Sequence, residues 1–239
     1  QGETFTAQYS EPFLAHATIE PMNCIAAVNG DKVELWGGFQ LPDWAVNTII
    51  KEFGYKKENV KLNLTLMGGG FGRRLHFEPA LEVVKIAQQF DKPVQVIWDR
   101  VDDTRFDAFR PASVHKLEAK LDKNGKLLAW QHHIAGPSIS IMTEGPDTKN
   151  LAENLGGADK DFWYDVPNVR TGFSSVNFNI NRGWLRAVEI CVNTFAVESF
   201  IDEIALHLKK DPLAYRLSLL EGRPAFDVRQ YGTIVKQEP

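Results

Sequence analysis

Three consecutive glycines, followed by an aromatic residue, a fourth glycine and two arginines, constrain this chain more than any other feature. They occupy residues 68–74 (GGGFGRR). Glycine adopts positive φ angles readily and lets a ligand approach the backbone, and arginine can donate paired hydrogen bonds to phosphate. The segment predicts a loop that binds an anion, with a purely structural tight turn as the alternative.

The residues on either side predict a strand before this loop and a helix after it. Residues 60–66 alternate between apolar and polar side chains, and residues 78–90 place apolar side chains on one helical face. Residues 91–93 (DKP) end that helix, and residues 94–98 predict a further strand. A loop between a strand and a helix can turn its backbone amides toward an anion-sized concavity.

Turn signals and apolar spacing predict the remaining elements. Asn29 and Gly30 favour a hairpin over residues 24–37, and Asp43 is expected to cap a short helix. The other expected elements are a second hairpin at 114–134, a long irregular segment at 136–169, a helix at 192–208 and a final helix opened by Asp211 and Pro212. Together they predict an α/β fold of mixed sheets flanked by helices.

Composition excludes several classes of function. The net charge of -4 comes from interspersed signs, so no basic stripe is available for nucleic acid. No apolar run approaches the ~20 residues that span a bilayer, and residues 1–3 lack a signal-peptide pattern, which leaves cytoplasm and periplasm open. Cys24 and Cys191 form no Cys-x-x-Cys pair, so any iron–sulfur centre is expected on another chain and both cysteines are expected to be buried.

The Gly-rich segment does not match the two familiar phosphate motifs. A P-loop needs Lys and then Ser or Thr after its last glycine, whereas Arg73, Arg74 and Leu75 follow here. The dinucleotide fingerprint needs Gly-x-Gly-x-x-Gly, which residues 68–72 do not supply. Kinase-type and nicotinamide-dependent functions are therefore excluded.

Several motifs in order resemble the molybdopterin-binding subunit of the xanthine dehydrogenase/aldehyde oxidase family. The resemblance covers about residues 9–222 and is closest to the isoquinoline 1-oxidoreductase β-subunit branch. It rests on residues 9–21 (YSEPFLAHATIEP), 36–42 (WGGFQLP), 68–74, 165–169 (DVPNV), 183–186 (GWLR), 198–205 (ESFIDEIA) and 211–216 (DPLAYR). It implies that the chain is the first molybdopterin-binding portion of such a subunit.

The resemblance also implies roles for single residues. Gln40 matches a glutamine beside the molybdenum that hydrogen-bonds one of its oxygen ligands, and Arg186 matches an arginine near the substrate. The loop residues would approach the metal and its pterin through backbone amides, with the arginines facing phosphates or pterin. These loop residues are Gly69, Gly70, Phe71, Gly72, Arg73 and Arg74. Because pterin sulfurs hold the metal in this family, no protein metal ligand is expected.

The implied function is a molybdenum hydroxylase or dehydrogenase that binds a molybdopterin (cytosine) dinucleotide. It would oxidise aldehydes or N-heteroaromatic compounds with water-derived oxygen and pass electrons to a 2Fe-2S partner subunit. The expected organisation is one domain over residues 1–222, with lobes of about 1–105 and 106–222 as a finer division. Residues 223–239 would form a tail leading to a missing second half.

Two departures from the family limit what this chain is expected to do alone. The general base of the family is a glutamate in a Gly-rich motif that does not follow residue 222, so the isolated chain is expected to be inactive and cofactor-free. The purine-oxidising branch places an acidic residue just after its Gly-rich loop, where Arg74 and Leu75 stand here. Purines are therefore disfavoured, and a non-catalytic cofactor-binding module stays as an alternative.

Other polar residues have a structural interpretation beside the functional one. His16 is more consistent with a core or supporting histidine than with a catalytic one, and Glu20 with either role. His132 and His133 are adjacent on a predicted strand, so they point to opposite faces and cannot share a metal. Carboxylates on the 192–208 helix, such as Glu198, are expected to form a solvent-exposed face of that helix. Arg110 has either a structural role or a contact with phosphate. We also expect Gln40 within about 10 Å of the loop, because both would reach one cofactor.

Overall fold

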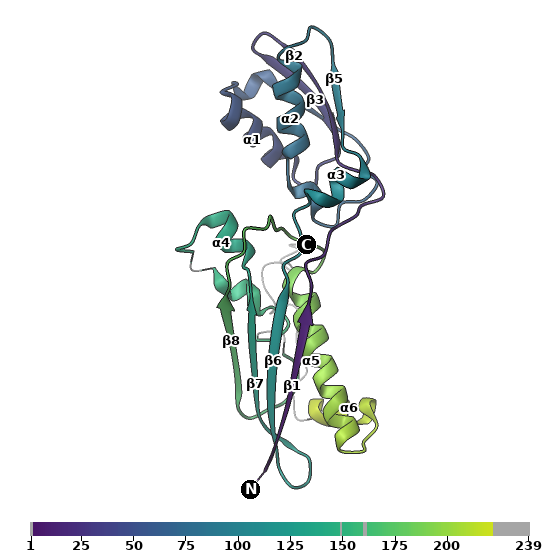
Figure 1. Ribbon diagram of the computed structural model, residues 1–239, viewed down its shortest axis with the longest axis vertical. Coiled ribbons are helices and arrows are strands. Elements are labelled where there is room, and N and C mark those ends of the chain that lie inside the picture. The colour runs from purple at the N-terminus through teal and green to yellow at the C-terminus, as the bar shows by residue number, and fades with distance from the viewer. Residues whose placement is uncertain (1, 149, 160–161, 222–239) are drawn as a thin grey trace, which may run out of the picture.

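The chain forms two four-stranded sheets that lie end to end in an elongated molecule (Figure 1). The structure is a computed structural model and describes residues 2–148, 150–159 and 162–221. It confirms the expected α/β class of mixed sheets flanked by helices. Within those ranges, no helix combines the length and the apolar character that crossing a membrane requires.

The upper sheet of Figure 1 contains the predicted hairpin. Strand β2 pairs antiparallel with β3 and β5, and β3 pairs parallel with β4. Gly30 turns the hairpin with φ 59°, as the Asn-Gly signal predicts. The strands are β2 (Asn23–Asn29), β3 (Lys32–Gly37), β4 (Val60–Leu64) and β5 (Val94–Ile97).

Two helices cover one face of this sheet, α1 (Pro42–Phe53) and α2 (Glu78–Ala87). Both bury apolar residues against the sheet. On α1 the predicted Ile49 is buried together with Ala45, whereas Trp44, also expected on the apolar face, is exposed. The prediction that Asp43 caps α1 is wrong. Pro42 occupies the first turn because its fixed φ suits that position, and the preceding residue makes no side-chain cap bond. A 3-10 turn, η1 (Lys57–Asn59), leads from α1 into β4.

The lower sheet has the order β1-β6-β7-β8. The predicted second hairpin is confirmed as β6 (Ser113–Leu121) and β7 (Leu127–Gly136). The sequence did not predict β1 (Glu3–Glu11), antiparallel to β6, or β8 (Val169–Ser175), parallel to β7. Both are edge strands with much of their length exposed. In β1 the alternation of Phe5, Ala7 and Tyr9 with polar residues is the signal that indicates the strand, whereas β8 shows such alternation only weakly.

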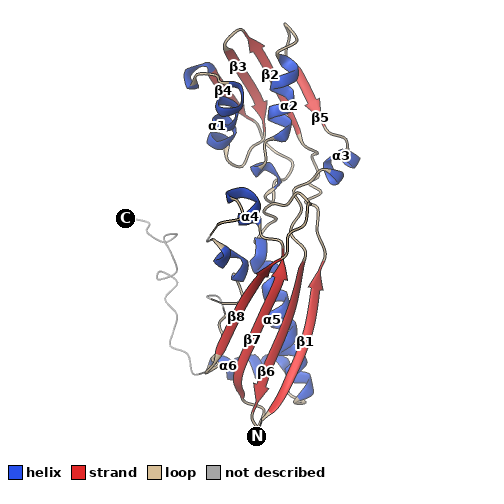
Figure 2. Ribbon diagram, turned by 60° about the vertical axis from the view of Figure 1, so that its left-hand side comes forward, coloured by secondary structure: helices blue, strands red, loops and turns tan. Residues whose placement is uncertain are grey.

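One long helix, α5 (Val188–His207), packs on one face of the lower sheet, and α6 (Pro212–Leu220) packs against α5 (Figure 2). Helix α5 begins four residues before the predicted start. The predicted cap of α6 is confirmed, since Asp211 Oδ1 accepts a hydrogen bond from the backbone N of Ala214 at 2.8 Å. The opposite face of the sheet carries no helix among the described residues (Figure 2).

The chain passes between the two sheets several times. The short helix α3 (Arg100–Arg105) lies at this junction, where Leu14 pairs with Arg110 and Phe109 with Arg182. The segment expected to be irregular contains α4 (Ile139–Glu144) and η3 (Leu151–Leu155), so that prediction is partly wrong.

The predicted division into lobes of about 1–105 and 106–222 stays a prediction. The structure adds that β1, which lies in the first of these ranges, pairs with β6 in the second. The predicted tail at 223–239 lies outside the described residues.

Candidate functional site

Residues 68–74 form the predicted loop between β4 and α2, ending in a 3-10 turn, η2 (Arg73–Leu75). Gly69 and Gly72 have φ values of 108° and 109°. A Cβ atom on Gly72 would lie 1.4 Å from the carbonyl oxygen of Trp184. Only glycine fits this position, because both the backbone angle and the neighbouring chain exclude a side chain.

The loop leaves three consecutive backbone amides available. The amide of Gly68 donates to Glu20 Oε2 at 2.5 Å and that of Gly72 donates to Gln40 Oε1 at 2.9 Å. The amides of Gly69, Gly70 and Phe71 donate to no group in the described part of the chain. Adjacent free amides form a site for an anion or an oxygen acceptor.

Gln40 lies directly against the loop, which confirms the prediction that the two are close. Its backbone N donates to the carbonyl of Arg74 at 3.0 Å, and its side-chain Oε1 accepts from Gly72. The side chain is exposed, and its Nε2 donates to no described residue. Because the contact with Gly72 occupies the amide oxygen, the amide nitrogen is left as the donor for a ligand.

Arg186 also reaches the loop, through its backbone. Its N–H donates to the carbonyl of Phe71 at 2.8 Å, and its side chain is exposed. Ala187 and Val188, with φ values of 63° and 48°, then turn the chain sharply into α5. Such conformations are unfavourable for residues with a Cβ atom and persist only where surrounding contacts hold them.

The guanidiniums of Arg73 and Arg74, expected to face phosphates or pterin, are instead turned into the protein. Both residues are 1% exposed, and their charges are paired inside the protein. Arg74 Nη2 lies 2.9 Å from Glu20 Oε2 and Arg74 Nε donates to the carbonyl of Gly69, while Arg73 Nε lies 3.0 Å from Asp107 Oδ1. Arg73 also lies over the Trp98 ring. The arginines therefore support the loop from within.

Glu20 is a site residue whose role the sequence left open. Besides Gly68 and Arg74, it accepts a hydrogen bond from Asn23. Burial would raise the pKa of its carboxyl, but these donors and the charge of Arg74 outweigh burial and lower it. An ionised Glu20 thus holds the start of the loop and neutralises the buried Arg74.

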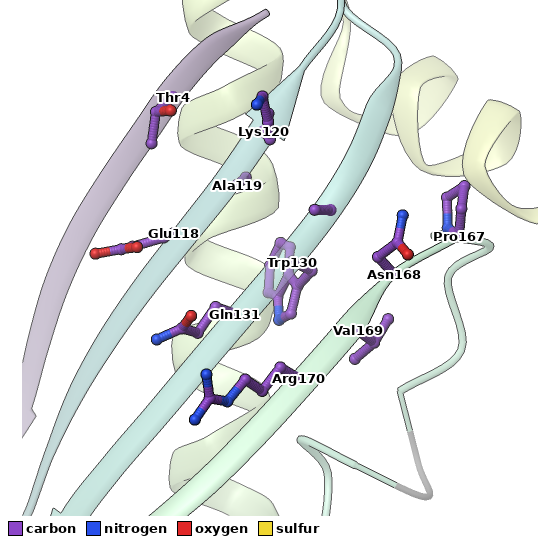
Figure 3. A pocket seen from close by; sticks show the side chains of 11 residues that line it. Thr4, Glu118, Ala119, Lys120, Trp130, Gln131, Pro167, Asn168, Val169 and Arg170 are labelled. Carbon is purple, nitrogen blue, oxygen red and sulfur yellow. The ribbon is translucent and has the colours of Figure 1, made fainter.

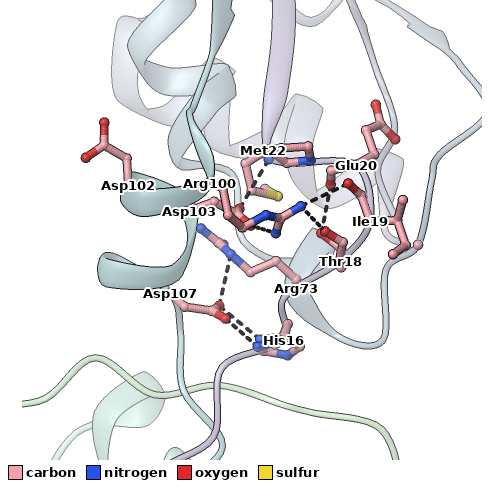
Figure 4. Close-up of polar contacts among 12 residues, drawn as sticks. His16, Thr18, Ile19, Glu20, Met22, Arg73, Arg100, Asp102, Asp103 and Asp107 are labelled. Atoms are coloured by element: carbon pink, nitrogen blue, oxygen red, sulfur yellow. Dashed lines mark hydrogen bonds and ion pairs between the residues drawn. The ribbon is translucent and has the colours of Figure 1, made fainter.

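Asp107 is a second residue of this site that the sequence did not indicate. Its carboxylate lies in the junction between the sheets and contacts both His16 and Arg73 (Figure 4). Nearby, Asp103 pairs with Arg100, whose guanidinium donates to the carbonyls of Thr18 and Ile19. Except for the pair of Arg100 with Asp103, which are three residues apart, these contacts join residues far apart in the sequence, so no local pattern signals them.

The remaining candidates have structural roles or lie elsewhere. His132 and His133 point to opposite faces as predicted. The buried His132 ring lies 3.0 Å from the His115 ring, and burial lowers the pKa of His132 to about 3 and that of His115 to about 4. Glu198 pairs with Arg216 and Arg110 with Glu11. Cys24 is buried as expected, whereas Cys191 is exposed, contrary to expectation. No three metal-ligating side chains converge within the described residues.

A shallow groove of about 510 Å³ lies on the helix-free face of the lower sheet (Figure 3). Its lining includes Thr4, Glu118, Gln131 and Arg170 from four strands. None of the loop residues contributes to it, so the groove is separate from the candidate site.

The chain is thus an α/β domain whose Gly-rich loop presents three backbone amides without a partner among the described residues. The family model of the molybdopterin cofactor-binding domain matches residues 2–219. The chain belongs to the molybdopterin cofactor-binding domain family, which confirms the resemblance drawn from its motifs.

Two relatives share at least 30% of their aligned residues with this chain. The chain is 31% identical over 228 residues to the "Membrane-bound aldehyde dehydrogenase [pyrroloquinoline-quinone]" of Gluconacetobacter polyoxogenes, covering 90% of this chain and 29% of the relative. It is 30% identical over 230 residues to the "Isoquinoline 1-oxidoreductase subunit beta" of Brevundimonas diminuta, covering 93% and 29%. The chain thus spans less than a third of the length of these relatives.

Solved structures share the fold. Quinoline 2-oxidoreductase from Pseudomonas putida 86 superposes with a TM-score of 0.74 at 20% identity, over 90% of this chain and 28% of that one. At this identity the likeness concerns the fold alone.

Proposed function

We propose that this chain holds one side of a molybdopterin dinucleotide in a molybdenum hydroxylase or dehydrogenase that oxidises aldehydes or N-heteroaromatic compounds. The observation that carries the proposal is the row of free amides at Gly69, Gly70 and Phe71 beside the free Nε2 of Gln40. When bound, the molybdenum–pterin group supplies a two-electron oxidation in which water provides the oxygen. The names of the two relatives support both substrate classes.

The donor set fits such a group. All four free donors are neutral N–H groups, which suit oxygen and sulfur acceptors and bring no competing charge. Gly70 lets the Gln40 side chain lie against the loop, because a Cβ atom there would lie 2.6 Å from Gln40 Oε1. The ion pairs of Arg74 with half-buried Glu20 and of Arg73 with buried Asp107 hold these donors in place before any ligand arrives.

The substrate would lie between the loop and Arg186. The exposed guanidinium of Arg186 is free to orient a carbonyl or ring nitrogen, since its own backbone is tied to Phe71. We further propose that residues 1–222 form the first cofactor-binding domain of a longer subunit. The general base lies outside this chain, and a 2Fe-2S partner subunit accepts the electrons.

A metal and cofactor assay of the full-length protein tests the proposal. We expect molybdenum together with a releasable pterin, and oxidation of an aromatic aldehyde or of quinoline with an artificial electron acceptor. Pyrroloquinoline quinone without molybdenum would contradict the cofactor assignment. Molybdenum without turnover of either substrate class would favour a non-catalytic cofactor-binding module.

Gly70→Ala tests the loop itself. Its Cβ would displace the Gln40 amide, so we expect loss of most of the molybdenum and pterin. Gly172→Ala is the matched control, because its Cβ would meet only the side chain of His133 at 3.1 Å. Equal molybdenum contents in the two variants would show that the loop does not hold the cofactor.

A further inference from the structure

One buried carboxylate links the Gly-rich loop to the segment that carries Arg186. Asp107 is 1% exposed and lies between α3 and β6, where the chain passes from one sheet to the other. Its Oδ2 accepts a hydrogen bond from the backbone N of His16 at 2.5 Å, and its Oδ1 lies 2.9 Å from His16 Nδ1. The same Oδ1 lies 3.0 Å from Arg73 Nε, at the end of the loop. Figure 4 shows these contacts converging on one side chain.

His16 carries the connection to the far side of the site. Its second ring nitrogen, Nε2, lies 2.9 Å from the carbonyl oxygen of Trp184. That carbonyl is the atom against which Gly72 packs, and two residues later the amide of Arg186 donates to Phe71. The contacts therefore run from Asp107 through His16 to Trp184 and close on the loop at Arg186.

The Asp107 carboxylate stays charged in this environment. Burial alone would raise its pKa, but the hydrogen bonds from His16 and the charge of Arg73 outweigh burial and lower it. Moving either His16 or Arg73 away would leave the buried Asp107 carboxylate without one of its partners, which is unfavourable. The carboxylate therefore holds both residues in place. The segment after Trp184 needs such an anchor, since Ala187 and Val188 hold positive φ angles.

We propose that Asp107 is a positioning residue that fixes the Arg186 segment against the Gly-rich loop, acting through His16. The proposal deepens the proposed function, because it assigns the placement of the substrate-facing arginine to a carboxylate that contacts neither substrate nor cofactor. It rests on the proposed function only for the role of Arg186 in substrate binding. The linkage itself is a property of this chain.

The first test measures hydrogen exchange in Asp107→Asn within the full-length protein. An asparagine side chain has one oxygen acceptor, and its NH₂ group would face an N–H donor of His16. The two bonds that tie His16 to residue 107 therefore cannot both form. We expect amide exchange in residues 183–188 to become at least about tenfold faster. Asp103→Asn is the matched control, because Asp103 is equally buried and pairs with Arg100 and the Met22 amide without contacting His16. In Asp103→Asn, amide exchange in residues 183–188 should be as slow as in the natural protein.

A pair of His16 variants isolates the step to Trp184 should Asp107→Asn fail to fold. The amide nitrogen of a glutamine can replace Nε2 and that of an asparagine can replace Nδ1. His16→Asn therefore loses the Trp184 contact and should loosen residues 183–188 fully, whereas His16→Gln keeps that contact and the backbone bond to Asp107 and should loosen them less. Equal exchange in both variants, or no change in folded Asp107→Asn, would overturn the proposal.

Steady-state kinetics separate positioning from general damage. We expect Asp107→Asn to raise KM about tenfold, more than it changes kcat per bound molybdenum. Combined with Arg186→Ala, it should raise KM no further than Arg186→Ala alone, because both changes remove one interaction. Additive effects would overturn the positioning role. Faster exchange together with an unchanged KM in Arg186→Ala would support the linkage and instead contradict the proposed function of Arg186.

Discussion

Hydrogen-bond donors decide the charge state of each buried carboxyl near the site. Glu20 and Asp107 are both partly or fully buried, yet their partners lower the pKa of each. Glu189, in the first turn of α5, has the opposite balance. Burial raises its pKa to about 7, nearby Glu153 adds to the rise, and its Oε1 is buried without a partner among the described residues. Ionisation of Glu189 therefore opposes folding.

Replacing Glu189 with glutamine should remove a pH-dependent loss of stability. The folded state holds the Glu189 proton more tightly than the unfolded chain, whose pKa is near the ordinary 4.5. Stability linked to this proton is complete below pH 4.5 and is lost as the pH rises to about 7. We expect Glu189→Gln to lack that loss and to exceed the natural protein at pH 8 by about 2–3 kcal/mol in free energy of unfolding.

Urea unfolding at pH 5 and pH 8 checks the Glu189 prediction. Glu52→Gln, on the exposed side of α1, is the control and should leave the difference between the two pH values unchanged. A Glu189→Gln variant with the same pH dependence as the natural protein would show that this carboxyl is solvated or paired.

At the scale of elements, the loop and the segment before α5 are built as one unit. The loop needs glycine at position 72 because the Trp184 carbonyl fills the space of a side chain. In return, Phe71 accepts the hydrogen bond that precedes the sharp turn into α5. Neither segment can keep its conformation if the other moves.

Gly72→Ala is expected to separate these two segments. The new Cβ would meet the Trp184 carbonyl carbon and oxygen, and the φ of 109° disfavours alanine in addition. We expect loss of bound molybdenum and faster amide exchange in both residues 68–75 and 183–188. Gly30→Ala also replaces a glycine with positive φ but meets nothing within 4 Å, so it should lower stability by only about 1 kcal/mol and keep the cofactor.

At the scale of the whole molecule, the two sheets have separate hydrophobic cores. One core joins α5 to the lower sheet around Trp130 and Phe200, and the other joins α1 and α2 to the upper sheet around Leu35 and Ile49. The polar contacts of Asp107 and His16 lie in the junction between them. A defect within one core should therefore reach the loop weakly.

Phe200→Ala tests this separation. Phe200 is 0% exposed, and its ring packs 5.1 Å from that of Trp130 and 5.6 Å from that of Phe5. Its removal should lower the free energy of unfolding by about 3–5 kcal/mol, while amide exchange in residues 68–75 stays unchanged. Phe195→Ala, on the exposed side of the same helix, should have a smaller effect. Faster exchange in the loop of Phe200→Ala would show that the two cores unfold together.

Short-range patterns determined much of this protein from its sequence. The Asn-Gly hairpin, the strand–loop–helix arrangement around residues 68–74 and the Asp211 cap depend on neighbouring residues, and all three are found in the structure. The family motifs also predicted that Gln40 lies near the loop, and its side chain accepts a hydrogen bond from Gly72. Local backbone preferences and ordered motifs are written in the sequence itself, so they can be predicted from it.

Only the tertiary structure decided which charges the site keeps for a ligand. Arg73 and Arg74 have the sequence pattern of phosphate-binding residues, yet Asp107 and Glu20 pair with them inside the protein. Strand β1 likewise joins a sheet whose other strands begin at Ser113, a partnership that its own residues do not specify. Burial and ion pairing depend on segments that are distant in the chain and meet only when it folds, which is why no local pattern reveals them.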